Sequence, residues 1–221
     1  MKYDSIFDVI GHIMVGPSSS HTFGAGRIGY IAQLILGGPP VRCEIFLHGS
    51  FAETYRGHGT DKALLAGILG IPPDDERLRD AFKIAREKNI KYSFKKVDLG
   101  ADYHPNTVKI ILYSKDDKLV IIGSSIGGGN IIIEEIDGME AGFNGDKATL
   151  ITIHEDKVGV VAKITSLISS FDLNIEAMRV SRDIRTNRAL CWIELNYFIP
   201  EELVKELEKL NEVEKVRVLN V

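Results

Sequence analysis

Two segments of this 221-residue chain place a histidine among small polar residues at a predicted helix start. The first is the run Gly16-Pro17-Ser18-Ser19-Ser20-His21-Thr22. Hydroxyl groups and free backbone N–H groups at a helix N-terminus favour a bound carboxylate or phosphate, and the helix dipole adds to this. A single hydroxyl would be enough to cap the helix. Three consecutive serines and a histidine exceed that need, so the run predicts an anion site, with simple capping as the alternative.

The second segment is Arg56-Gly57-His58-Gly59-Thr60-Asp61. Thr60 is expected to cap a helix, and Asp61 suits its first turn. The glycines beside His58 let the backbone approach a ligand and place the imidazole at the mouth of a site. An imidazole titrates near neutral pH, which suits a general base. A loop histidine that only faces solvent is the alternative.

Two further segments carry weaker signals. In His104-Pro105-Asn106-Thr107, the proline favours an extended conformation at His104, so that His104 and Asn106 point the same way and could bind one ligand. A plain strand entry explains this segment equally well. In Ser124-Ser125-Ile126-Gly127-Gly128-Gly129-Asn130, the glycines could turn backbone donors toward an anion, or form only a turn or bulge.

The elements that must position these four segments make up an α+β domain. Apolar periodicity predicts helices near residues 5–13, from the serine run to about residue 36, over 60–69 and over 75–88, the last capped by Asp74. β-Branched runs predict strands over 41–48, 90–98, 107–114 and 119–125, the last two joined by the turn Asp116-Asp117. We therefore expect a substantial mixed or antiparallel sheet with helices.

A turn-rich stretch over residues 138–145 separates this part from a second one. We place the boundary so that residues 1–146 and 147–221 form two domains. The second domain reads as strand 148–154, helix 158–171, strands 174–182 and 188–198, a helix opened by Pro200, and strand 213–218. This βαββαβ order is ferredoxin-like, a four-stranded antiparallel sheet with both helices on one face. Asp156, a possible helix cap, and Gly159 are expected to be structural.

Composition excludes several classes of function. A net charge of −4 without a basic run argues against nucleic acid, and the apolar stretch 28–36 is too short for a bilayer span. No secretory signal is readable at Met1-Lys2-Tyr3-Asp4, so we expect a cytoplasmic protein. Cys43 and Cys191 lie in apolar runs and are expected to be buried, reduced thiols. Two thiols cannot hold a four-iron cluster, which takes about three or four.

In this order, the four segments resemble the β domain of bacterial iron-sulfur L-serine dehydratases. The string over residues 16–22 is the most specific match, joined by residues 57–61, His104-x-Asn106 and residues 125–129. Residues 148–221 resemble an ACT domain through Asp156-x-x-Gly159 and the order of elements. The resemblance implies an L-serine ammonia-lyase that forms pyruvate and ammonia without pyridoxal phosphate. A [4Fe-4S] cluster, ligated by a separate cysteine-bearing alpha subunit and not by this chain, would act as the Lewis acid at the serine hydroxyl.

The same resemblance implies roles for individual residues. His58 would remove the α-proton of the substrate, while His21 would position the substrate, aided by a positive charge on its ring. His104 and Asn106 match positions of an amino-acid effector site. The residues that would contact L-serine are Ser18, Ser19, Ser20, Thr22, Thr60 and Asp61.

Several alternatives remain open from the sequence. A non-catalytic serine sensor is one, since the chain also resembles the allosteric substrate-binding and ACT domains of phosphoglycerate dehydrogenases. A hydrolase using Ser20 and His21 would lack the Gly-x-Ser-x-Gly elbow. ACT domains commonly pair, which implies a homodimer through both domains, and their ligand could be an amino acid or a monovalent cation. Threonine adds one methyl group to serine, which a pocket discriminates by only about 1–3 kcal/mol.

Overall fold

The computed structural model describes residues 15–221, and the chain divides into two compact units, one up to Asp137 and one from Gly138. The helix predicted near residues 5–13 lies outside the described residues. Both units contain helices and strands, and in the first unit most helices precede a run of consecutive strands, which confirms the α+β class. Within residues 15–221, no helix combines the length and apolar character needed to cross a membrane.

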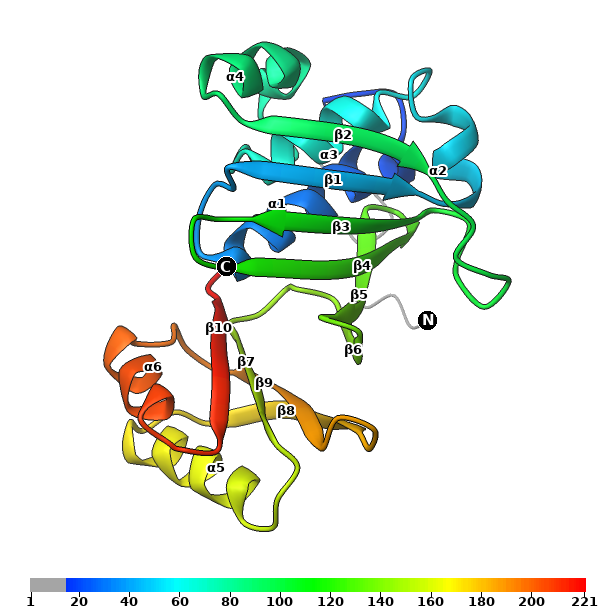
Figure 1. Ribbon diagram of the computed structural model, residues 1–221. Coiled ribbons are helices and arrows are strands. Elements are labelled where there is room, and N and C mark those ends of the chain that lie inside the picture. The colour runs from blue at the N-terminus through cyan, green and yellow to red at the C-terminus, as the bar shows by residue number, and fades with distance from the viewer. Residues whose placement is uncertain (1–14) are drawn as a thin grey trace. The chain divides into compact units, whose positions relative to one another are not determined.

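The first sheet has the strand order β2-β1-β3-β4-β5-β6 (Figure 1). Strand β1 runs parallel to β2 and antiparallel to β3, and the pairs β3–β4 and β4–β5 are antiparallel, so the predicted mixed sheet is confirmed. The strands are β1 (Arg42–Leu47), β2 (Lys91–Lys96), β3 (Thr107–Tyr113), β4 (Lys118–Gly127), β5 (Asn130–Ile136) and β6 (Met139–Phe143).

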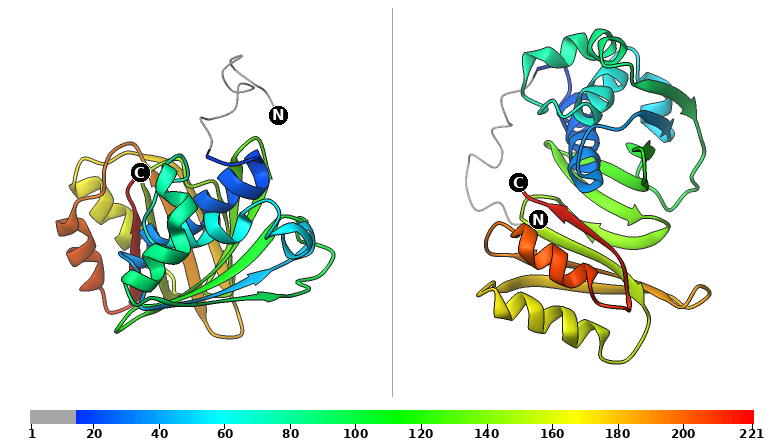
Figure 2. Two further views of the ribbon diagram at one scale, coloured as in Figure 1. Left: turned by 90° about the horizontal axis from the view of Figure 1, so that it is seen from above. Right: turned by 60° about the vertical axis from the view of Figure 1, so that its left-hand side comes forward.

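Helices cover one face of this sheet (Figures 1 and 2). They are the π-helix η2 (Ser19–Gly24), α1 (Ala25–Leu36), α2 (Gly49–Thr54), α3 (Thr60–Ile68), the 3-10 helix η3 (Glu76–Asp80) and α4 (Ala81–Glu87). Apolar residues of α1 and α3 are fully buried together with alternate residues of β1, β3 and β4. The largest such side chains include Ile28, Leu64, Ile45, Ile110 and Leu119.

Helices α1 and α3 cross at close range because glycines line their contact. A Cβ atom built on Gly67 would lie 2.5 Å from the backbone nitrogen of Tyr30 and closer still to the carbonyl oxygen of Gly26. A Cβ atom on Gly29 would likewise overlap the carbonyl oxygen of Leu64. The two backbones therefore touch directly, and this crossing helps to hold the two histidine-bearing helix starts in register.

The helix predicted over residues 75–88 is wrong as a single element. It is broken into η3 and α4, and the cap is Asp75, whose carboxylate accepts a hydrogen bond of 2.8 Å from the backbone N–H of Arg77. Asp74 plays no such part. Helix α2 was not predicted, because its six residues are too short to show helical periodicity.

Two other local predictions also need correction. Gly59, not Thr60, is the N-cap of α3, and its φ of 68° is a left-handed conformation that glycine adopts without strain. The stretch predicted as turn-rich contains β6, in which Met139, Ala141 and Phe143 are buried in alternation. Gly142 on the exposed side of this short strand, together with Gly138 and Gly145 beside it, obscured its pattern.

The second unit contains the predicted βαββαβ element order. Its sheet has the strand order β10-β7-β9-β8, with every pair antiparallel. Both helices lie on one side of this sheet and share its apolar core (Figure 2). The elements are β7 (Thr149–Glu155), α5 (Val160–Ser170), β8 (Ile175–Asp183), β9 (Arg188–Leu195), α6 (Glu201–Glu208) and β10 (Val213–Leu219).

Asp156 does not cap α5. Gly159 is the N-cap residue, and the Asp156 carboxylate instead accepts a hydrogen bond of 2.6 Å from Nε of Arg182. Cys43 and Cys191 are buried free thiols, as predicted. Burial raises the pKa of each thiol to about 12, so neither is a thiolate near neutral pH.

Candidate functional site

The serine run forms a π-helix at the start of α1. Ser18 is its N-cap, and its hydroxyl accepts a hydrogen bond of 3.1 Å from the backbone N–H of His21. Residues 19–24 then make the wider turn before α1 continues from Ala25. Capping therefore uses only the first of the three serine hydroxyls. Such π turns are rare and often occur at functional sites.

His21 lies between two hydroxyl groups. Its Nδ1 is 3.0 Å from Oγ of Ser20, and its Nε2 is 2.9 Å from Oγ of Ser50. The ring also meets the edge of the buried Phe51 ring at a centroid distance of 5.4 Å. Sequence reasoning missed Ser50, which enters the site through α2. Only a prediction of that short helix could have drawn attention to it.

The second imidazole, that of His58, stands next to the first. The ring centroids of His21 and His58 are 4.9 Å apart, with the planes tilted by 47°. Burial, and then the charge of His58, lower the pKa of His21 below its usual range. The neutral form of His21 is thereby favoured. Its two hydroxyl neighbours suit this form, because one can donate to the ring and the other can accept from it.

His58 is fixed by its backbone and not by its side chain. Its carbonyl oxygen accepts a hydrogen bond of 2.9 Å from Oγ1 of the buried Thr22, and its N–H donates to the carbonyl of Thr54. Nδ1 of the ring is buried and has no hydrogen-bond partner among the described residues. An orphaned ring nitrogen is costly, so it is a natural place for a ligand or partner group.

The third and fourth segments join this region through α2 and β4. The carbonyl of Pro105 accepts a hydrogen bond of 2.8 Å from the backbone N–H of Ser50, the residue that contacts His21. The carbonyl of Asn106 accepts from the N–H of Ser125 at 3.0 Å. His104 is exposed, and its Nδ1 accepts from the N–H of Asn106 at 3.1 Å. This bond closes a tight turn at the entry to β3.

Buried hydroxyls connect the same two segments. Oγ1 of Thr107 is 2.6 Å from Oγ of Ser124. Oγ of Ser125 is buried and has no partner among the described residues, and it lies where a side chain on Gly24 would sit. The π-helix can therefore approach β4 only because residue 24 is a glycine.

Thr60 and Asp61 stand apart from the hydroxyl cluster. Thr60 is fully buried at the start of α3, and its Oγ1 has no hydrogen-bond partner among the described residues. Asp61 is half-buried, and its carboxylate accepts from the N–H of Lys62 at 2.8 Å. Burial raises the pKa of Asp61, against the opposing effect of Lys62 and Arg56.

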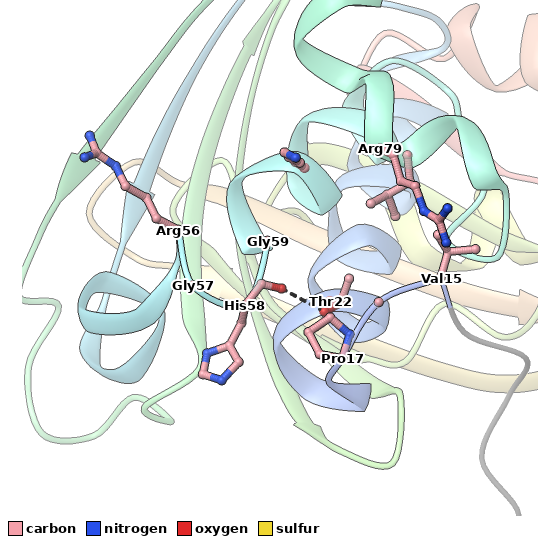
Figure 3. A pocket seen from close by; sticks show the side chains of 11 residues that line it. Val15, Pro17, Thr22, Arg56, Gly57, His58, Gly59 and Arg79 are labelled. Atoms are coloured by element: carbon pink, nitrogen blue, oxygen red, sulfur yellow. Dashed lines mark hydrogen bonds between the residues drawn. The ribbon is translucent and has the colours of Figure 1, made fainter.

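A pocket of about 280 Å³ lies beside the loop that carries His58. Figure 3 shows the His58 imidazole on the side of this loop away from Arg79, while its carbonyl points to Thr22. The lining residues are Val15, Gly16, Pro17, Thr22, Arg56, Gly57, His58, Gly59, Lys62, Leu78 and Arg79.

The described residues do not fit an iron-sulfur cluster. They contain no group of three or more His, Cys, Asp or Glu side chains placed to hold a metal ion. Cluster ligation requires thiolates, and the two thiols of the chain are buried, with pKa values of about 12. They also belong to different compact units.

Two family matches cover most of the chain. Residues 5–136 match the family described as serine dehydratase beta chain, and residues 148–212 match the ACT domain family. The probable L-serine dehydratase beta chain of Bacillus subtilis is 41% identical over 98% of both chains. The L-serine dehydratase beta chain of Peptoniphilus asaccharolyticus is 41% identical over 90% of both.

A more distant similarity links the chain to another enzyme. The D-3-phosphoglycerate dehydrogenase of Methanocaldococcus jannaschii is 26% identical over 89% of this chain, which covers only 37% of that protein. The regulatory alternative considered from the sequence rests on this kind of likeness, which is much weaker than the match to the beta chains.

Proposed function

The chain belongs to the serine dehydratase beta chain family, and on that premise we propose that it is the beta chain of an enzyme that converts L-serine to pyruvate and ammonia. The observation that carries this proposal is the imidazole pair: His58, with an orphaned ring nitrogen, stands 4.9 Å from a His21 held between two hydroxyls. Such an arrangement supplies both a base and polar groups for a small amino acid.

In this proposal His58 takes the α-proton of L-serine. Loss of the β-hydroxyl as water then leaves aminoacrylate, which tautomerises to the imine and hydrolyses to pyruvate and ammonia. The His58 ring makes no hydrogen bond to the described residues, so its second nitrogen, Nε2, can accept the proton without first breaking one, while Nδ1 is buried. The loop glycines on either side leave room for the substrate beside the ring.

His21 and the serine run would bind the substrate carboxylate. The hydroxyl residues next to His21 in the sequence are Ser18, Ser19, Ser20 and Thr22. The N-terminal end of α1 adds a favourable potential for an anion. The lowered pKa of His21 favours a neutral hydrogen-bonding role over a permanent positive charge. Thr60 and Asp61 are the less favoured contacts, because Thr60 is fully buried and the Asp61 carboxylate would repel that of the substrate.

We further propose that a separate alpha subunit ligates the [4Fe-4S] cluster. The beta chain designation of the relatives supports a partner, and the two protonated, buried thiols of this chain are unsuitable ligands. The proposal includes no pyridoxal phosphate. It also places the enzyme in the cytoplasm, where reduced thiols such as Cys43 and Cys191 are ordinary.

The regulatory part of the proposal concerns the remaining segments. Residues 1–146 would form the serine dehydratase beta domain and residues 147–221 the ACT domain, with pairing of two chains through both. His104 and Asn106 would contact an amino-acid effector at the turn before β3. The ACT ligand would be an amino acid or a monovalent cation.

The decisive experiment is anaerobic reconstitution with a cysteine-bearing alpha chain, followed by a pyruvate assay of His58→Asn. We expect turnover to fall by about 10²–10⁴, the usual contribution of a general base. The variant should keep its fold and the iron content of the complex, because the His58 backbone, not its ring, makes the hydrogen bonds. The exposed His104→Ala is the comparison variant, and its maximal turnover should stay within about tenfold of the native value. Near-native turnover in His58→Asn would remove His58 from this role.

A further inference from the structure

Three basic residues are among those that line the pocket beside the His58 loop. Figure 3 shows the Arg79 side chain on the same side of this loop as Val15 and Thr22, whereas the Arg56 guanidinium is directed away from them. Arg56 comes from the loop after α2, Lys62 from α3 and Arg79 from η3, so three separate elements contribute one cation each. Among residues 15–221, those that line the pocket include no aspartate and no glutamate. A cavity built in this way attracts anions.

These three cations are not committed elsewhere. Arg56, Lys62 and Arg79 form no ion pair with any residue in the part of the chain that the structure describes. Arg56 only lies over the ring of Tyr55, at 5.4 Å. By contrast, Arg77 on the same 3-10 helix as Arg79 is held by Asp75, with Nε 2.9 Å from the carboxylate. Lys62 and Arg79 are therefore the cations available to a ligand in the pocket.

The start of α3 adds to the positive potential. Gly57, His58 and Gly59 line the pocket just before the first turn of this nine-residue helix, the positive end of its dipole. Asp61 opposes this potential through its electrostatic interaction with Lys62 and Arg56, but it does not line the pocket.

From this geometry we propose that the pocket is a second binding site, which takes a small anion with a carboxylate or phosphate head group. Guanidinium groups bind both head groups through charge-assisted hydrogen bonds. A volume of about 280 Å³ admits a ligand of metabolite size but not a polymer. The ligand would contact the backbone side of the His58 loop, opposite the imidazole, and would leave the hydroxyl cluster of His21 unoccupied. The pocket shares Thr22 and the His58 backbone with the proposed dehydratase site, but binding here requires no turnover and is measured on the chain alone.

The test is titration of the full chain with inorganic phosphate, pyruvate and L-serine in separate low-salt experiments. Binding is measured by the chemical shifts of the Gly57 and Gly59 backbone amides in NMR spectra. We expect saturable shifts with at least one anion, and the responding anion identifies the head group. Arg79→Gln should weaken this binding about tenfold, as expected for loss of one charge-assisted contact. Arg77→Gln, the matched control, should change it less than about twofold, since surface ion pairs contribute little.

Three results would overturn the proposal. The first is the absence of saturable shifts at Gly57 and Gly59 with all three compounds. The second is an equal loss of binding in Arg79→Gln and Arg77→Gln, which would indicate nonspecific attraction. The third is a response confined to Ser18 and His21. If Arg79→Gln does not fold, Lys62→Gln serves in its place with the same expected loss.

Discussion

Replacing Gly67 with alanine should separate the two helices that carry the candidate site. The new methyl group would lie 2.5 Å from the backbone nitrogen of Tyr30 and would overlap the carbonyl of Gly26. Overpacking usually costs about 1–3 kcal/mol, and backbone cannot rotate away, so the upper end applies. Alanine in a helix regains about 1 kcal/mol over glycine. We therefore expect a net loss of about 2 kcal/mol in the free energy of unfolding.

Urea unfolding measured by far-UV circular dichroism tests this value. The single tryptophan, Trp192, lies in β9, so its fluorescence reports separately on the second unit. Gly57→Ala is the matched control, since a methyl group there would meet only the carbonyl of Thr54 at 3.6 Å. Its stability should change by less than about 1 kcal/mol. If Gly67→Ala were as stable as the native chain, the close-crossing account of α1 and α3 would be refuted.

Four other outcomes follow from the described contacts. Ser50→Ala should lower the free energy of unfolding by about 1 kcal/mol, the value of one hydrogen bond, and an unchanged urea midpoint would contradict the contact with His21. Because the pKa of His21 in the folded state lies below its unfolded value of 6.5, its contribution to stability is fully present above pH 6.5 and is lost as the pH falls toward the folded pKa. His21→Gln should reduce this loss, measured as the free energy of urea unfolding across that pH range. His104→Ala or Asn106→Ala should weaken serine cooperativity while maximal turnover stays within about tenfold, and abolished turnover at saturating serine would exclude an effector role. Cys43 should resist a thiol reagent such as DTNB in the native chain and react after unfolding, whereas rapid native labelling would contradict its burial.

Much of the fold could be predicted because its strands and long helices have clear apolar patterns. The second unit is the strongest case, since β7 and β9 are runs of nearly continuous buried residues, α5 buries an apolar stripe, and the order of the elements defines the arrangement. The failures are short or glycine-containing elements. Helix α2 has six residues and β6 has five, too few to display a period against the surrounding turn residues.

The candidate site was predictable in its residue types and not in its contacts. The serine run and the His58 loop were recognisable because small polar residues at helix starts have few structural explanations. Ser50 was not recognisable, since a lone serine after a strand is common and its contact with His21 depends on where α2 turns back. The cationic pocket was equally hidden, because Arg56, Lys62 and Arg79 meet only after α3 and η3 have packed.

The hydrogen bonds around the two imidazoles favour His58 over His21 as the base. For His21 to act as the base, its unprotonated nitrogen would have to exchange a hydroxyl of Ser20 or Ser50 for the substrate. That exchange loses an existing hydrogen bond in a half-buried place, where it is expensive. His58 pays no such cost, because its ring makes no hydrogen bond to the described residues. When His58 takes the proton beside a neutral His21, only one of the two rings, whose centroids are 4.9 Å apart, becomes positive.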